Sequence, residues 1–301
     1  MNIKPKILVV GSSNMDMVIR TDHFPSPGET IIGGDFSMIP GGKGANQAVA
    51  AARLGGEVCF ISQVGNDVFG NQNLANYNKE GIDVSWIKQN PDKPTGVAMI
   101  TVDKSGENTF IVAPGANHAL NLEDIDAASK SFQSADIVLV QLEIAMEIVT
   151  EVCQKSFGLG KRVILNPAPA KELDDSIFHL LYLITPNETE AEFLTGIKVI
   201  GEASAYQAAS ILRTKGIKKV IITLGAGGAY LFTDEFQGII PTEKVKVKDT
   251  TAAGDTFNGA LAVALGNGKT IKEAVNFALK AATLSVQKFG AQTSIPYLKE
   301  L

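Results

Sequence analysis

Residues 249–257, with the sequence DTTAAGDTF, bring small residues and one carboxylate to the start of a segment with helical periodicity. Small side chains leave the first backbone N–H groups of a helix accessible, and these groups and the helix dipole favour an anion. Gly254 lets a phosphate approach the backbone closely, and Asp255 beside it is a candidate base. Phosphoryl transfer needs both features, since a base must face the attacking hydroxyl and N–H donors must face the transferred group.

Asp255 also has a purely structural interpretation. Aspartate is favoured near helix N-termini because it stabilises the helix by itself. From these residues alone, the catalytic and the capping interpretations are equally open.

Two common nucleotide-binding signatures are not matched by the chain. Residues 41–44, GGKG, lack the upstream spacing and the following Ser or Thr of a P-loop. Residues 225–227, GAG, are followed by Tyr230 where a dinucleotide fingerprint requires glycine. The helix start before Asp255 is therefore the candidate phosphate site.

Strand-like and helix-like segments alternate along the chain, and this alternation must position the candidate residues. Expected strands cover residues 7–10, 58–64, 137–140, 163–165, 182–185 and 220–224. Expected helices cover residues 45–54, 146–157, 188–194, 203–215, 254–265 and 271–286. Strands in regular exchange with helices indicate a mainly parallel sheet covered on both faces. We expect one three-layer αβα, Rossmann-like domain over residues 1–301, with a mostly parallel central sheet.

Two regions depart from this alternation. Residues 17–39 contain strand-like segments broken by prolines and glycines, and residues 97–102 and 109–112 flank a turn-like DKSGE and predict a hairpin. Together, residues of about 15–40 and 96–113 are expected to form a small inserted sheet that covers the substrate as a lid. An ordinary extension of the main sheet is the alternative.

The composition is typical of a soluble globular enzyme. The chain has 301 residues, of which 45% are hydrophobic, and a net charge of −5, so no broad basic surface is expected for nucleic acid or anionic lipid. Two isolated cysteines, Cys59 and Cys153, and three scattered histidines predict neither a disulfide framework nor a transition-metal site. The N-terminal MNIKPK leads into an apolar run too short for a signal sequence or a membrane span, and we expect a cytoplasmic protein.

Several motifs resemble those of the ribokinase family of carbohydrate kinases. Residues 249–257 look like the C-terminal signature of the family, and residues 41–48, GGKGANQA, look like its N-terminal signature. Residues 11–16, 186–190 and 290–294, with the sequences GSSNMD, PNETE and GAQTS, extend the resemblance over essentially the whole chain. Motifs in this order favour the catalytic interpretation of Asp255.

The resemblance implies two substrate sites. The sugar would be held by Asn14, Asp16, Gly42, Lys43, Asn46 and Glu143, with Asp255 as the base. Amide and carboxylate groups suit this role because they exchange hydrogen bonds with neighbouring hydroxyls. ATP with its Mg²⁺ would be held by Asn187, Glu190, Thr223, Gly225, Gly227, Gly228 and Gly254.

Each of these motifs has a simpler interpretation when taken alone. Residues 14–16 could be a turn at the end of a strand, and Lys43 could be a solvated loop charge. Residues 225–228 could be a glycine-rich turn between strands, and Glu190 could be an ordinary capping-box glutamate.

The resemblance also implies an activating monovalent cation, K⁺. Its oxygen ligands would come from Asp249, Thr251, Ser285, Lys288, Gly290 and Ser294, several of them through backbone carbonyls. One departure from the family is Leu279, because members of the family carry a histidine beside the adenine at this position. The nucleotide preference therefore stays open.

The reaction that the resemblance implies is phosphorylation of D-ribose at O5 by ATP, with Gly254 and Asp255 at the reacting groups. Lys43 after Gly41 and Gly42 favours ribose, because the fructokinase-like and nucleoside kinases of the superfamily resemble the pattern around residues 41–46 less closely. Kinases of deoxyribose, fructose or adenosine, and a non-catalytic sugar sensor, are the alternatives. Exposed edges of the lid are expected to pair two chains into a homodimer.

Overall fold

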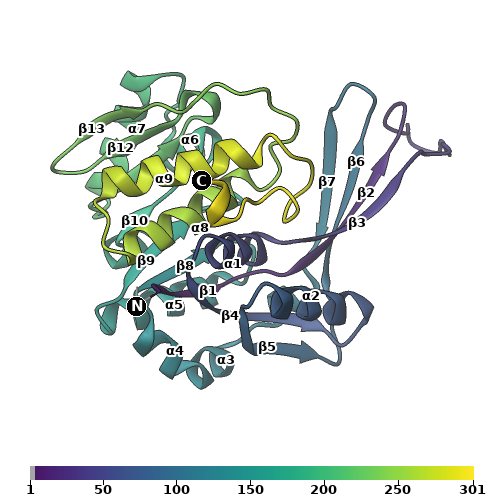
Figure 1. Cartoon of the computed structure of the whole chain (residues 1–301), viewed down its shortest axis with the longest axis horizontal. Helices are drawn as coiled ribbons and strands as arrows, with labels where there is room; N and C mark the ends of the chain where they lie inside the picture. The colour runs from purple at the N-terminus through teal and green to yellow at the C-terminus, as the bar shows by residue number, and fades with distance from the viewer. Residues whose placement is uncertain (1–3) are drawn as a thin grey trace.

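The computed structural model describes residues 4–301. Residues 1–3 lie outside the described residues. They belong to the N-terminal segment for which no signal sequence was expected. A nine-stranded sheet with helices on both faces forms the body of the molecule, and a four-stranded sheet projects from it (Figure 1). The predicted α/β fold with a mostly parallel central sheet is confirmed.

The central sheet is parallel over most of its width. Its strands are β1 (Lys6–Val10), β4 (Glu57–Gly65), β5 (Asp83–Asn90), β8 (Ile137–Gln141), β9 (Arg162–Asn166), β10 (Leu183–Ile184), β11 (Val220–Thr223), β12 (Ala229–Phe232) and β13 (Gln237–Ile240). Their order is β13-β12-β11-β10-β9-β8-β1-β4-β5. Only the pairs β11–β12 and β12–β13 are antiparallel among the described strands of this sheet. β5, β12 and β13 were not predicted.

Helices cover the two faces of this sheet in separate layers. The helices are α1 (Lys43–Arg53), α2 (Val68–Lys79), α3 (Leu122–Ala127), α4 (Ser129–Ser134), α5 (Met146–Gly158), α6 (Glu188–Thr195), α7 (Glu202–Thr214), α8 (Ala253–Gly266) and α9 (Ile271–Ser285). Side chains of β1 alternate between the two layers, since Ile7 and Val9 belong to the hydrophobic cluster that includes residues of α1, α8 and α9, whereas Leu8 and Val10 belong to the cluster that includes residues of α3 to α7. This alternation is what a strand buried on both faces requires.

α1 and α8 pack closely because both are rich in small residues. A Cβ atom on Gly259 would lie 2.6 Å from the Cβ of Ala50 and 2.8 Å from the carbonyl oxygen of Gln47. The close approach brings the starts of the two helices, and hence the two signature segments, next to each other. The fold thus joins two motifs that lie about 200 residues apart in the chain, as the contact of Asn46 with Asp255 shows.

The small sheet is separate from the central sheet, so the alternative of an ordinary extension is wrong. It contains β2 (Asn14–Arg20), β3 (Phe36–Gly41), β6 (Gly96–Val102) and β7 (Asn108–Ala113) in the order β3-β2-β6-β7. β6 and β7 form the predicted hairpin, and β6 pairs with β2 in parallel. One face lines a cavity of about 340 Å³ against residues of the body, and the other face carries a row of apolar residues across the strands: Met38, Met17, Met99 and Ile111.

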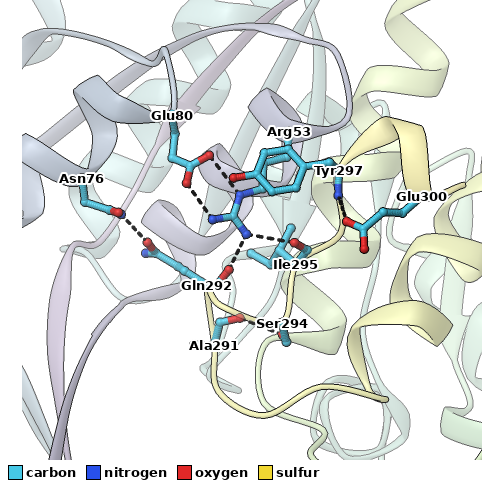
Figure 2. A network of polar contacts seen from close by, with 9 residues as sticks. All are labelled: Arg53, Asn76, Glu80, Ala291, Gln292, Ser294, Ile295, Tyr297 and Glu300. Carbon is cyan, nitrogen blue, oxygen red and sulfur yellow. Dashed lines mark hydrogen bonds and ion pairs between the residues drawn. The ribbon is translucent and has the colours of Figure 1, made fainter.

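The C-terminal segment is anchored to the ends of α1 and α2 through Arg53, which also forms a partly buried ion pair with Glu80 (Figure 2). The Arg53 guanidinium donates to both carboxylate oxygens of Glu80, at 3.0 and 2.6 Å, and to the carbonyl oxygens of Gln292 and Ile295, at 2.6 and 2.9 Å. It also lies 4.7 Å from the centre of the Tyr297 ring. Four of the five N–H groups of the guanidinium therefore have an acceptor among the described residues, which stabilises a charge that has little access to solvent.

Within residues 4–301, no helix is both long enough and apolar enough to cross a membrane. The cytoplasmic location stays a prediction. Cys59 and Cys153 are free thiols, as predicted.

Candidate active site

Asp255 lies in the first turn of α8 and is buried between two amide side chains. Asn46 Nδ2 donates to its Oδ2 at 3.0 Å, and Gln47 Nε2 donates to its Oδ1 at 3.1 Å. Burial raises the pKa of Asp255 above its ordinary value, while the Lys43 ammonium and the two amides act in the opposite direction. Asp255 is thus shielded from water, but Lys43 and the two amides favour its ionised form, which can accept a proton.

The start of α8 presents backbone N–H groups that no side chain of residues 4–301 caps. Ala252, at the N-cap, has a φ of 59°, a left-handed conformation that is uncommon for a residue other than glycine. The N–H groups of Gly254 and Asp255 have no acceptor within the helix, because the first-turn groups never do. A Cβ atom at Gly254 would meet nothing within 4 Å, so space is left in front of these groups. The arrangement can accept an anion.

A cavity of about 180 Å³ lies in front of this helix start. Its lining includes Lys43, Asn187, Glu190, Thr223, Gly254 and Asp255. The predicted base and the predicted phosphate contacts thus face the same space, which is the geometry that transfer between two substrates needs.

Lys43 is the first residue of α1 and is surrounded by carboxylates. Burial lowers the pKa of its ammonium, but the charges of Asp255, Glu143, Glu190 and Asp16 outweigh burial and raise the pKa above its ordinary value. Lys43 therefore stays protonated and is a fixed positive charge of the site, not a solvated loop charge.

The other predicted sugar ligands lie around the start of α1. Asn14 and Asp16 lie on β2, so the alternative of a strand-end turn is wrong. Gly42 has a φ of 89°, and a Cβ atom there would lie 2.8 Å from the backbone nitrogen of Asn14. Glu143 Oε2 accepts from Ser12 Oγ at 2.6 Å and from the backbone N–H of Lys43 at 3.0 Å.

The Asp16 carboxyl, which is partly exposed, has a strongly raised pKa. Burial and the neighbouring charges of Glu143 and Asp255 raise its pKa from 3.8 to about 7. Its carboxylate packs against Gly41, where a Cβ atom would lie 2.3 Å from an oxygen. A sugar hydroxyl can therefore meet either a donor or an acceptor at this position near neutral pH.

A second cavity, of about 420 Å³, extends from Gly254 along α8 and α9. Thr223, Gly225 and Gly228 line it at the turn between β11 and β12, whereas Gly227 is not among its lining residues. Much of the remaining wall is apolar and contains Val245, Val247, Phe257, Leu279, Ala282 and Val286. The glycine-rich turn is thus present and also borders a cavity large enough for a nucleotide.

Asn187 and Glu190 form a reciprocal cap at the start of α6. The backbone N–H of Asn187 donates to Glu190 Oε2 at 2.9 Å, and the backbone N–H of Glu190 donates to Asn187 Oδ1 at 2.8 Å. The capping-box interpretation is confirmed. Because both residues also line the cavity before Asp255, capping does not remove them from the site.

The residues predicted for a monovalent cation lie beside the loop that precedes α8. Asp249 accepts from the N–H and hydroxyl of Thr251 and, through its other oxygen, from the N–H of Gly290 at 2.8 Å. Ser285 and Ser294 are buried and donate to backbone carbonyls, which leaves their oxygen lone pairs available, and the Lys288 side chain pairs with Glu300. One carboxylate with carbonyl and hydroxyl oxygens fits a weakly held monovalent cation. No group of three or more His, Cys, Asp or Glu side chains that could hold a metal occurs among the described residues.

Several polar residues of the site were missed by the sequence analysis. Gln47, Gln141 and Asn166 are buried beneath Asp255, and Asn117 donates to Asn14 Oδ1 at 2.6 Å. Gln141 and Asn166 are the last residues of β8 and β9. Polar residues at the carboxyl ends of parallel strands are the signal that could have identified these two.

Comparisons with known proteins agree with this geometry. The model of the pfkB family of carbohydrate kinases matches residues 4–298. The chain is 45% identical to a ribokinase of Haemophilus influenzae over 99% of this chain and 97% of the relative. The crystal structure of a Thermotoga maritima ribokinase has a TM-score of 0.88 at 41% identity, covering 99% of this chain and 98% of its own. The Arabidopsis thaliana ribokinase complexed with ribose and ATP has a TM-score of 0.89 at 32% identity, covering 99% and 97%. The resemblance predicted from the motifs is confirmed, and the chain belongs to the pfkB family of carbohydrate kinases.

Proposed function

We propose that the protein is a ribokinase that transfers the γ-phosphoryl group of ATP to O5 of D-ribose. The observation that carries the proposal is the position of Asp255, which lies between a polar cluster suited to a polyol and an uncapped helix start suited to phosphate. Full-length similarity to ribokinases, one of them complexed with ribose and ATP, supports ribose as the sugar.

In this mechanism the sugar lies against Asn14, Asp16, Gly42, Lys43, Asn46 and Glu143. Asp255 accepts the proton of the O5 hydroxyl as the oxygen attacks the γ-phosphorus, and the bond from phosphorus to the β-γ bridging oxygen breaks. The N–H groups of Gly254 and Asp255 donate to the phosphoryl oxygens, where negative charge accumulates. Lys43 remains protonated beside them and offsets that charge.

The nucleotide occupies the cavity lined by Thr223, Gly225, Gly228 and Leu279, with Gly227 completing the turn. Asn187 and Glu190 would hold the Mg²⁺ that accompanies ATP, which would offset phosphate charge. Oxygens of Asp249, Thr251, Ser285, Lys288, Gly290 and Ser294 would hold K⁺, which would order the loop before α8.

A coupled assay of ADP release over ribose, deoxyribose, fructose and adenosine tests the assignment. We expect ribose to give the highest kcat/KM, and turnover to increase when K⁺ replaces a large organic cation at constant ionic strength. A higher kcat/KM for deoxyribose, fructose or adenosine would reassign the substrate. Ribose binding without ADP release would favour the sugar sensor instead.

The small sheet is proposed to act as a lid and as the dimer interface. Its inner face borders the cavity that contains Asp16, and its outer face exposes Met38, Met99 and Ile111. Exposed apolar rows of this kind mark interaction surfaces, and the free edges of β3 and β7 allow pairing between chains. Sedimentation velocity is expected to show a dimer that Ile111→Lys weakens, and a monomer of the unmodified chain at assay concentration would contradict the proposal.

A further inference from the structure

Beneath Asp255 lies a connected set of buried amide side chains that the proposed mechanism does not use. Gln47 comes from α1, Gln141 from the end of β8, and Asn166 from the end of β9. Gln47 and Gln141 have no solvent exposure, and Asn166 has 6%. Buried amides are costly unless they are hydrogen-bonded, so the way these three are connected carries information.

The direction of the hydrogen bonds is fixed from one end of the set. Asn166 Nδ2 donates to the backbone carbonyl of Thr185 at 3.2 Å, and a carbonyl can only accept. Asn166 must therefore turn its Oδ1 toward Gln47, whose Nε2 donates to it at 3.0 Å. The second hydrogen of the same Nε2 points to Asp255 Oδ1 at 3.1 Å.

Gln141 completes the set at the other end. Its Nε2 donates to Gln47 Oε1 at 2.7 Å, while its own Oε1 has no hydrogen-bond partner among the described residues, so the orientation of Gln141 follows from that of Gln47. Rotating the Gln47 amide by half a turn would place its oxygen against two acceptors and its nitrogen against a donor. Room for Gln141 depends on Gly11, where a Cβ atom would lie 2.1 Å from Gln141 Oε1.

Both oxygens of Asp255 consequently accept an amide hydrogen bond, one from Asn46 and one from Gln47. A protonated carboxyl group would lose acceptor capacity and face a donor with its own hydrogen, so the two amides favour the ionised form. The charged groups that face Asp255 are Lys43 on α1, Glu143 after β8, Glu190 on α6 and Asp16 on β2. Three of these four are carboxylates, which together with burial work against ionisation.

We propose that Gln47, oriented by Asn166 and hydrogen-bonded to Gln141, is a positioning residue that keeps Asp255 ionised and aimed at the acceptor hydroxyl. The inference rests on the proposed function only in taking Asp255 as the base. It assigns a role in the reaction to a residue that touches neither substrate.

The main test is the pH dependence of kcat/KM for Gln47→Met, measured with the sugar that the unmodified enzyme uses best. Methionine keeps the length of the side chain but cannot donate. We expect the acidic limb of the profile to move to higher pH by about one to two units, the shift expected for losing one hydrogen bond to a carboxylate. Activity should recover toward that of the unmodified enzyme at alkaline pH.

Two further variants separate this role from ordinary packing. Gln141→Met removes the donor to Gln47 Oε1 and so loosens Gln47 without contacting Asp255, and we expect a smaller shift in the same direction. Val49→Ala, on the same buried helix, is the matched control, because it should lower the melting temperature and leave the acidic limb in place. If Gln47→Met does not fold, Gln141→Met still decides the question.

An unmoved acidic limb in both glutamine variants would overturn the proposal, and so would equal losses of activity at every pH. Titration of the Asp255 carboxyl by ¹³C NMR in the unliganded protein gives a readout that needs no turnover. We expect its pKa to rise in Gln47→Met. If the unmodified protein has no kinase activity, the proposed function fails, while the titration still tests the inference.

Discussion

The two halves of the site are built from different materials. The half assigned to the sugar consists of charged and amide side chains, several joined by hydrogen bonds of 2.6 to 3.1 Å. The half assigned to the nucleotide is built mainly from glycines, backbone N–H groups and a wall that is largely apolar and includes Val247 and Leu279, although Glu243 and Lys244 also line it. Side chains specify a ligand by leaving a wrong one unpaired, whereas an apolar wall discriminates weakly. Selectivity should therefore be high toward the sugar and low toward the base of the nucleotide.

Asp255→Asn is the strongest test of this division, because it removes the base where the halves meet. We expect kcat to fall by about 10² to 10⁴-fold with little change in nucleotide affinity. Since burial raises the pKa of Asp255, its charge destabilises the fold at neutral pH, and the variant should be more stable there. Steady-state kinetics and thermal unfolding at neutral pH measure both effects.

Glu273→Gln is the matched control for that variant. Glu273 occupies the same position in α9 as Asp255 does in α8, but it belongs to an exposed capping box with Thr270. It should lose a little stability and no activity. If Asp255→Asn behaved in the same way, the capping interpretation of Asp255 would be correct and the catalytic one wrong.

Lys43→Met tests the single positive charge of the sugar half. We expect kcat/KM to fall by about 10²-fold, because a preorganised donor is lost where charge develops. The acidic limb of the pH profile should also move to higher pH, since Lys43 lowers the pKa of Asp255. A loss confined to nucleotide affinity would place Lys43 in the nucleotide half and contradict its assignment to the sugar.

Asp16→Asn should change the pH dependence of stability. The folded protein binds the Asp16 proton more tightly than the unfolded chain, because the pKa is raised from 3.8 to about 7. The stability from this proton is complete below the lower value and is lost as the pH rises to the upper one. Relative to the unmodified protein, the free energy of unfolding of the variant should increase by about 2 kcal/mol over that window. Solvent screens part of the interaction because the Asp16 side chain is partly exposed, which keeps the gain below that of a fully buried group.

Urea unfolding of the unliganded protein at several pH values measures this gain. The difference in free energy of unfolding should grow between the two pKa values and stay constant above them. A difference that does not depend on pH would show that Asp16 is ionised throughout and would contradict the pKa assigned to it.

Leu279→Met should have the smallest effect. The replacement conserves volume in the apolar wall, so we expect KM for ATP to change by less than about tenfold and KM for the sugar to stay constant. A similarly small preference should appear between ATP and GTP. Strong discrimination between the two nucleotides would reveal base recognition by groups other than the wall and would contradict the low selectivity expected toward the base.

Local features of the fold and of the site could be predicted from the sequence because their signals are local. The helix that begins just before Asp255, the hairpin of β6 and β7, and the motif at residues 41–48 each depend on a short stretch of chain. The antiparallel edge of β12 and β13 was not predicted, because its short apolar runs follow a glycine-rich turn that was interpreted as a ligand loop.

The amides beneath Asp255 could not be predicted for a different reason. Gln47 contacts Asn166 and Gln141 across separations of 119 and 94 residues. Nothing in the types of these residues says which strand ends meet which helix. Only the order of the strands, which places β1, β8 and β9 side by side, brings them together.

The ion pair of Arg53 and Glu80 has a consequence for how the chain folds as it is synthesised. Both residues leave the ribosome early, yet two of the four hydrogen bonds of the guanidinium wait for carbonyl groups 239 and 242 residues later. Until those residues arrive, a charge at the end of α1 lacks part of its partners. The contacts that complete the Arg53 site therefore become available only after residues 292 and 295 have been synthesised. We expect fragments that stop short of residue 292 to be cut by proteases near the end of α1 more readily than the full chain.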